Sequence, residues 1–256
     1  MSWAERRRFF ILLGIGLVIA AFIAIILIAS FYKTPTCTDG IQNQSEQGID
    51  CGGPCPYLCT ALEQPPTVLF TKVLQNANAE GRTDVIALVE NKNANAAAKN
   101  VPYQISLYGA DQTLIQEVSG TIDLPPGATE PVFVPGIFSG EQKVGSAFLT
   151  IATSSPQWFF MAANARITPM VSNIIRSGTA SNPRVEATLT NPSAAAMTNV
   201  QATILVYDAN KNVIAASQTV VPIIAGQSQA VATFTWNSAF LGTPALLEVV
   251  PIIPLP

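Results

Sequence analysis

The chain has 256 residues, a formal net charge of −3 and a charged fraction of only 11%. This balance excludes a basic surface of the kind that neutralises a phosphate backbone, so nucleic acid is not an expected partner. The absence of histidine removes the usual general base, the imidazole ligand of zinc sites and the Ser-His-Asp arrangement. The sequence also has no Gly-rich phosphate loop and no nucleophile elbow, so we expect a non-enzymatic protein with no catalytic residues.

The first predicted element is a membrane-spanning helix over residues 9–31, which follows a cytoplasmic stub of residues 1–8. The helix segment is apolar and carries no charge, and at about 1.5 Å per residue it spans the roughly 30 Å hydrocarbon core. Arginines occupy positions 6–8, and only Lys33 closely follows the span. The positive-inside rule therefore places the N-terminus in the cytoplasm and the later domains outside. The competing interpretation is a cleavable signal peptide, whose apolar region is usually about 7 to 15 residues long.

Small residues recur at every fourth position of this helix, at Gly16, Ala20 and Ala24. The spacing puts them on one helix face, where a second helix can approach closely. The alternative is that these residues face lipid and have no packing partner. The lipid bilayer is thus an expected partner through residues 9–31, and a homo-oligomer or a larger membrane complex is compatible with the packing face.

All four cysteines follow the helix within a module of residues 37–60, and they are Cys37, Cys51, Cys55 and Cys59. An even number of clustered cysteines outside the cytoplasm predicts two disulfides that hold a segment too small to bury its own core. Four cysteines allow three pairings, and the sequence does not choose among them. The alternative is a tetrahedral zinc site, but the spacings lack the paired two-residue knuckles of zinc fingers.

Four oxygen-bearing side chains lie between the first two cysteines, in a loop that contains glycine: Asp39, Asn43, Glu46 and Asp50. Hard oxygen ligands in such a loop suit calcium, which is the one cofactor that we consider for this chain. The alternative is that these residues form turns whose side chains bond the local backbone.

This stretch resembles a short module of secreted and surface proteins with the pattern Cys-x-Asp-Gly-x-x-Asn-x-x-Glu-x-x-x-Asp-Cys-Gly-Gly-x-Cys. The matching residues are Cys37, Asp39, Gly40, Asn43, Glu46, Asp50, Cys51, Gly52, Gly53 and Cys55. The resemblance implies an exported, disulfide-bonded element and no activity.

The rest of the chain contains an internal repeat, residues 67–153 and 166–253. Val85 to Asn91 aligns with Val185 to Asn191 at an offset of 100, and Tyr108 aligns with Tyr207 at an offset of 99. Pro126-Gly127 and Ala225-Gly226 are expected to be equivalent and to precede matching strands. One duplicated domain explains this pattern better than coincidence.

Each copy alternates apolar and polar residues in short stretches, as over residues 103–108 and 201–207. Such alternation predicts strands with one buried face. Turn-forming residues at 111–112 and 210–212 separate paired strands and indicate hairpins. We therefore predict a mainly β fold: one transmembrane helix, a small disulfide-rich segment and two tandem immunoglobulin-like antiparallel β-sandwiches.

The repeats also resemble the FxLYD-type domains of prokaryotic envelope proteins. The similarity lies in Ile105-Ser106-Leu107-Tyr108 and in Ile204-Leu205-Val206-Tyr207-Asp208, although both copies lack the leading Phe. It implies an extracytoplasmic sandwich, often appended to other machinery, with no catalytic residues.

A linker of residues 154–165 is expected between the copies, and it contains the apolar residues Trp158, Phe159 and Phe160. Packing at the interface between the two sandwiches is the favoured interpretation, and an exposed contact patch is the alternative.

Together these features predict a single-pass membrane protein whose domains act outside the cytoplasm as a structural or adhesive interaction module, with an unidentified protein partner at the cell envelope. Two alternatives remain. One is an accessory subunit of a membrane secretion or surface-fibre complex, and the other is a sandwich that binds carbohydrate or another small ligand.

Overall fold

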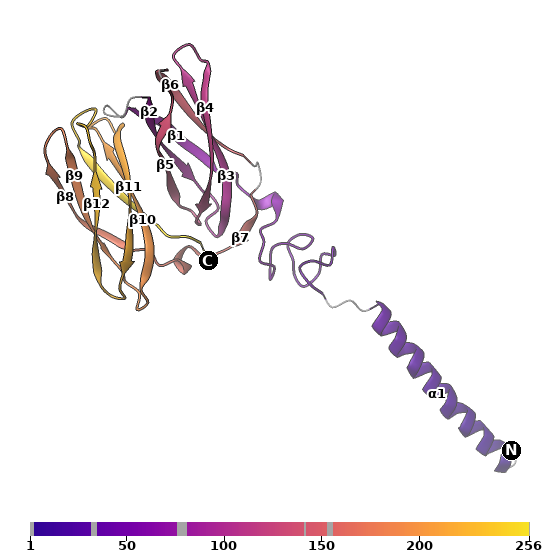
Figure 1. Ribbon diagram of the computed structural model, residues 1–256. Helices are drawn as coiled ribbons and strands as arrows, with labels where there is room; N and C mark the ends of the chain where they lie inside the picture. The colour runs from indigo at the N-terminus through magenta and orange to yellow at the C-terminus, as the bar shows by residue number, and fades with distance from the viewer. Residues whose placement is uncertain (1–2, 32–34, 76–80, 141, 153–155, 256) are drawn as a thin grey trace. The chain divides into compact units, whose positions relative to one another are not determined.

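The computed structural model (Figure 1) describes residues 3–31, 35–75, 81–140, 142–152 and 156–255. Lys33 and the first two residues of the expected linker, 154 and 155, lie outside the described residues. The chain divides into two compact units, Met1–Pro56 and Tyr57–Pro256, and each is described by itself.

The first unit begins with the helix α1, Trp3–Phe31. A stretch long and apolar enough to cross a membrane runs from Arg6 to Ala29, and none of its most apolar part is buried in the protein. The large apolar side chains from Phe9 to Ile28 are between 47% and 69% exposed. By its length and composition this helix could cross a membrane.

The disulfide module has little regular structure. Its described elements are an isolated bridge between Gly48 and Cys51 and the short 3-10 helix η1, Thr60–Leu62. All four cysteines are disulfide-bonded, and the pairs are Cys37 with Cys55 and Cys51 with Cys59. The predicted pair of disulfides is therefore confirmed, and the pairing that the sequence left open is the interleaved one.

The first sandwich consists of two three-stranded antiparallel sheets, with a short seventh strand added to one of them (Figure 1). The strands of one sheet are β1 (Thr67–Gln75), β2 (Arg82–Glu90) and β5 (Thr129–Phe138), in the order β1-β2-β5. Those of the other are β4 (Leu114–Leu124), β3 (Ala96–Gly109) and β6 (Val144–Ile151), in the order β4-β3-β6.

The second sandwich repeats the order of the six main strands of the first. One sheet has the order β12-β9-β8, with β12 (Gln229–Thr235), β9 (Pro183–Thr190) and β8 (Met170–Gly178). The other has the order β11-β10-β13, with β11 (Val213–Ile224), β10 (Met197–Tyr207) and β13 (Leu246–Ile252). The mainly β fold with two tandem sandwiches is confirmed, as are the hairpins between β3 and β4 and between β10 and β11.

Alternation of side chains across each strand builds the two cores. In β9 the residues Val185, Ala187 and Leu189 are at most 1% exposed, while the residues between them face outward. The corresponding residues of β2, Val85, Ala87 and Val89, are fully buried. Sequence alternation located these strands because the side-chain period of a strand is two.

One part of the predicted alignment is wrong by one residue. Gly127 donates its N–H to the Asn93 carbonyl, and Gln227, not Gly226, makes the equivalent bond to Ser193. Gly127 and Gln227 share a left-handed backbone, with φ of 58° and 53°. Gly226 is needed for a different reason, because a side chain there would collide with the Ala194 carbonyl. Two glycines with different functions were thus mistaken for equivalents.

The best-preserved polar feature of the repeat is a buried asparagine at the end of β2 and of β9. The Asn91 amide nitrogen donates to the carbonyls of Ala96, Leu124 and Pro125 at 2.7–3.3 Å. The Asn191 amide nitrogen contacts the carbonyls of Ala195, Ile224 and Ala225 at 2.8–3.1 Å. Each asparagine therefore satisfies backbone acceptors of two loops of its sandwich and joins them.

Replacing Asn191 with Ala is expected to lower the free energy of unfolding of the second sandwich by about 1–3 kcal/mol, because buried carbonyls lose their donor. Urea denaturation with Trp236 fluorescence as the probe measures this loss. Asn182→Ala, at an exposed position before β9, is the control and should change stability by less than about 0.5 kcal/mol. Equal effects of the two substitutions would contradict the assignment.

Candidate functional site

The acidic side chains of the disulfide module bind its own backbone. Asp39 Oδ1 accepts the N–H of Ile41 at 2.9 Å, and Asp39 Oδ2 accepts that of Thr36 at 3.1 Å. The Asp50 carboxylate accepts the N–H groups of Asp39 and Gly40 at 2.9–3.2 Å. These bonds fold the loop on itself without regular secondary structure, in the manner of Asx turns.

Glu46 and Asn43 complete this network. Glu46 Oε2 accepts the N–H groups of Asn43 and Asp50 at 3.3 and 3.2 Å, and Asn43 Nδ2 donates to Asp39 at 2.9 Å. Asn43 Oδ1 is buried with no hydrogen-bond partner. The four side chains proposed for calcium therefore share one network, but within residues 35–56 no three carboxylates converge as a ligand group. A calcium site stays a prediction, and it would require an ion to displace backbone N–H groups.

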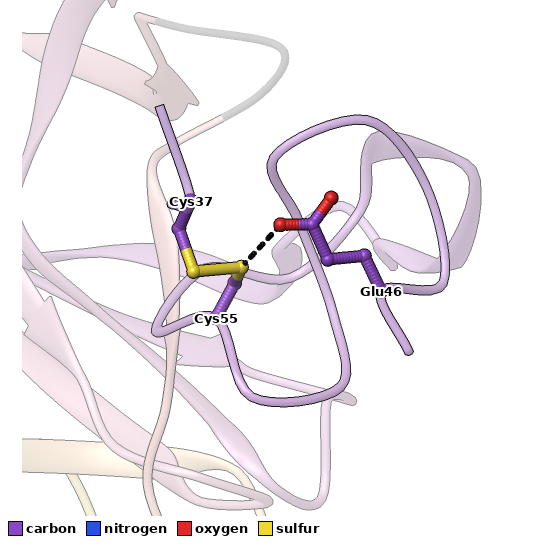
Figure 2. Close-up of side chains that lie close together, drawn as sticks. All are labelled: Cys37, Glu46 and Cys55. Carbon is purple, nitrogen blue, oxygen red and sulfur yellow. Dashed lines mark hydrogen bonds between the residues drawn. A yellow bond between two sulfur atoms is a disulfide. The ribbon is translucent and has the colours of Figure 1, made fainter. Parts of the chain in front are cut away.

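The one described group of potential metal ligands in the chain is Cys37, Glu46 and Cys55, shown in Figure 2. Both sulfurs belong to one disulfide with an S–S distance of 2.05 Å. A bridged sulfur is not a thiolate and does not ligate zinc. The disulfide interpretation of the cysteines is thus confirmed over the zinc alternative.

Glu46 nevertheless has a specific position on this bridge. Its Oε1 lies 3.1 Å from Cys55 Sγ, the contact drawn in Figure 2, and Cys55 is only 2% exposed. Because a bridged sulfur carries no proton, the contact is close packing of the carboxyl group on the sulfur. An incoming thiolate therefore meets both a buried sulfur and a carboxyl group, which protects the bridge from thiol exchange.

Trp158 lies in the core of the first sandwich, so its predicted packing between the two sandwiches is wrong. It begins the short strand β7, Trp158–Phe160, which pairs with the first residues of β3. Its side chain is 1% exposed and belongs to the first core. Phe160 is 39% exposed, and the Phe159 backbone forms a bridge to Tyr57. Part of the expected linker is therefore the seventh strand of the first sandwich.

The three small residues of α1 lie on the uncovered helix. No atom lies within 4 Å of a side-chain position built at Gly16. Within the described residues of the first unit, this face of the helix is open, as the packing hypothesis requires.

An apolar cluster joins the two sandwiches. Leu74 and Ile86 from the first copy pack with Leu205, Val213 and Ala216 from the second, and all five are at most 5% exposed. Burial of this cluster holds the sandwiches together in one compact unit.

A buried ion pair forms the polar side of the same joint. Arg166, directly after the 3-10 helix η2 (Ala163–Ala165), contacts Glu130 of β5 at 3.2 Å. The side chains of Arg166 and Glu130 are 9% and 7% exposed. Arg166 also donates to the Ile253 carbonyl beyond β13. One arginine thus connects the first sandwich to the end of the second.

The chain end adds a second polar connection. Leu255 is 2% exposed, and its N–H donates to Asp123 of β4 at 2.9 Å. The other Asp123 oxygen accepts the N–H of Asn100 at 2.8 Å. Residues at the end of the second copy are therefore built into the surface of the first.

Glu130 is the most perturbed acid in this joint. Burial raises its pKa to about 7, against the opposing charge and hydrogen bond of Arg166, and the charge of Asp123 raises it further. Glu130 Oε2 is buried without a partner, as is Arg166 Nε. Each partner of this ion pair therefore has a buried polar atom without a hydrogen bond. Arg166 thus offsets only part of the effect of burial on the Glu130 carboxyl group.

The stability of the joint is expected to fall as pH rises. The pKa of Glu130 is about 7 in the folded protein, and its ordinary value is 4.5. Between these pH values the folded protein therefore binds more protons than the unfolded protein. The free energy of unfolding should decrease by up to about 3 kcal/mol between pH 4.5 and 8. Urea denaturation across this range measures it, and Glu130→Gln should flatten the dependence. A profile unchanged by Glu130→Gln would contradict the assignment.

Two clefts lie between the sandwiches, each of about 360 Å³. One is lined by Glu130, Asp123 and several amide side chains from both copies. The other contains Asp84, whose pKa is raised by burial and partly offset by the N–H of Gly136 at 2.6 Å.

Sequence reasoning missed Glu130 and Arg166, although the repeat contained a signal for the first. Glu130 pairs with Val89 in the first copy, and Ala230 pairs with Leu189 in the second. A charged residue at a position that is Ala in the other copy is not required by the common fold. No comparable signal exists for Arg166, because it precedes β8, the first strand of the second copy, and belongs to no alternating stretch.

No known family model matches the chain, and no curated protein is similar to it. Among solved structures, the chain is similar to red sea bream transglutaminase, with 12% sequence identity and a TM-score of 0.26 over 73% of this chain. The chain spans 29% of the length of that structure. A similarity at this level carries no argument about activity, so function has to be argued from the chain itself.

Proposed function

We propose that this chain is a membrane-anchored, non-enzymatic protein that holds a stiff pair of sandwiches outside the cytoplasm as a structural or interaction module. The observation that carries the proposal is the uncovered apolar surface of α1 over Arg6–Ala29. Lipid is the environment that stabilises such a surface. The two disulfides support an oxidising compartment for the region after the helix.

Stiffness supports the structural role. The joint between the sandwiches combines the apolar cluster around Ile86 and Leu205 with the Arg166–Glu130 pair. A joint that is apolar and ion-paired at once resists rotation of one sandwich on the other. The protein would therefore present its outer loops and strand edges at a fixed spacing to a partner at the envelope.

Anchoring and orientation can be tested in the cells that express the full chain. We expect the protein to stay with membranes during alkaline carbonate extraction. Protease added outside should remove the sandwiches and leave a short fragment containing α1. The paired substitution Leu17→Lys and Ile23→Lys should release the protein, because each charge at mid-membrane costs about 2.5–3.5 kcal/mol. Ile167→Lys, at an exposed apolar position of the sandwich region, is the matched control.

Two results would overturn this proposal. Extraction of the unaltered chain by carbonate would show that α1 does not anchor it. Protection of the sandwiches from external protease until the membrane is opened would show the opposite orientation.

The second candidate is an accessory subunit of a membrane secretion or surface-fibre complex, and the open face at Gly16, Ala20 and Ala24 favours it. Ala20→Leu should then abolish a crosslink to a membrane partner while anchoring is retained. Val18→Leu, elsewhere on the helix, should leave the crosslink intact.

A further inference from the structure

One of the two clefts has the character of a small-molecule site. It is formed by both sandwiches and has a volume of about 360 Å³, within the range of about 300–1,000 Å³ that is usual for ligand pockets. Its lining combines neutral polar side chains with apolar ones and two acids, and the neutral polar residues include Asn100, Tyr103, Asn199, Gln201 and Gln218. Such groups offer both donors and acceptors of hydrogen bonds.

The two repeats contribute the same residue to this cleft. Asn100 in β3 and Asn199 in β10 are at equivalent positions, and both have a left-handed backbone, with φ of 52° and 51°. Both are exposed. The duplicated fold therefore places two matching amide side chains at one cleft.

Glu130 supplies a buried acceptor in the lining of the cleft. The residue is 6% exposed, and its Oε2 has no hydrogen-bond partner. A buried acceptor of this kind is stabilised when a ligand donates an O–H or N–H to it.

The charges around the cleft select the ligand class. The carboxylates of Glu130 and Asp123 disfavour an anion, and the Arg166 guanidinium is already used by Glu130 and by the Ile253 carbonyl. An ammonium ligand would satisfy Glu130 but would leave the amide donors of the lining unpaired, because ammonium groups only donate. Hydroxyl groups donate and accept, so they match the polar part of the lining, and the carbon skeleton of a polyhydroxylated ligand can contact its apolar part.

We propose that the cleft between the two sandwiches binds a small neutral polyhydroxylated ligand, of the size of a mono- or disaccharide, with one ligand hydroxyl donating to Glu130 Oε2. The amides of Asn199 and Gln201 bind further hydroxyl groups. This site goes beyond the anchoring function and does not depend on it.

Binding should be coupled to ionisation of Glu130. A ligand hydroxyl that donates to Oε2 favours the carboxylate over the acid form. Since burial holds the pKa of Glu130 at about 7, binding near neutral pH should release protons and tighten as pH rises.

The test is calorimetric titration of the full chain, solubilised in a zwitterionic detergent without sugar headgroups. The probes are glucose, galactose, N-acetylglucosamine, maltose and cellobiose, with putrescine and inorganic phosphate as the competing ligand classes. We expect saturable binding of at least one sugar. Asn199→Ala and Gln201→Ala should each weaken it about five- to tenfold, which corresponds to one lost hydrogen bond. Gln229→Ala, an exposed amide of β12 outside the cleft, should leave it unchanged.

Titrations in two buffers with different ionisation enthalpies give the number of protons released. Glu130→Gln should abolish the release, whereas Gln229→Ala should keep it. The proposal is overturned if none of the five sugars binds, if binding survives both cleft substitutions, or if only putrescine or phosphate binds.

Discussion

Replacing Trp158 with Ala should destabilise the first sandwich by about 3–5 kcal/mol, the usual loss for removing a buried tryptophan from a packed core. Trp158 is among the largest fully buried side chains, and it packs with residues of both sheets of this sandwich. Removing it leaves a cavity that the flanking strands can fill only in part. The short strand β7 should also pair less firmly with β3, because the Trp158 side chain fixes it in the core.

Hydrogen exchange measured by mass spectrometry can localise this effect. We expect faster exchange over β7 and the first residues of β3, with β9 and β10 of the second sandwich unchanged. Phe160→Ala is the matched control, since Phe160 belongs to the same strand but is 39% exposed. The substitution of Phe160 should cost less than about 1 kcal/mol. A larger effect in the second sandwich than in the first would support the interface position that the sequence suggested.

The difference between the predicted and the observed position of Trp158 has a physical reason. Strands such as β9 were predictable because their alternation is a local property of the sequence. The three residues of β7 are too few to show a period, and their pairing with distant residues of β3 and with Tyr57 makes them a strand. Apolar residues between two predicted domains can therefore be buried either in the core of one domain or at the interface between them. The sequence alone does not distinguish these two positions.

In the disulfide module, too, the composition predicts that bonds form but not which residues are bonded to each other. Four clustered cysteines were enough to predict two disulfides, because the chemistry depends on compartment and number. The interleaved pairing depends on where Asp50 and Glu46 hold the loop through backbone N–H groups. Those side-chain to backbone bonds have no sequence period, so neither the pairing nor the position of Glu46 beside Cys55 could be derived.

Replacing Arg166 with Ala should cost about 3–5 kcal/mol at pH 8, above the raised pKa of Glu130, because it leaves the buried Glu130 carboxylate without its counter-charge. This loss of stability should mainly affect the contact between the two sandwiches. The Ile253 carbonyl would lose its donor as well, so the chain end that binds Asp123 through Leu255 should open. Exchange of the Leu255 amide is expected to accelerate about a hundredfold. Arg184→Ala removes an exposed arginine that pairs with Glu186 and should cost less than about 1 kcal/mol.

The pH dependence separates a lost charge pair from lost packing. Burial is the main cause of the raised pKa of Glu130, and Arg166 lowers it, so Arg166→Ala should raise this pKa further. At pH 5 the carboxyl group is then neutral and tolerates burial, whereas at pH 8 ionisation opposes folding. The destabilisation by Arg166→Ala should therefore be larger at pH 8 than at pH 5, and Glu130→Gln in the same chain should remove most of the difference. If the two losses are equal, the arginine acts through packing of its aliphatic stem, and the joint is not held by charge.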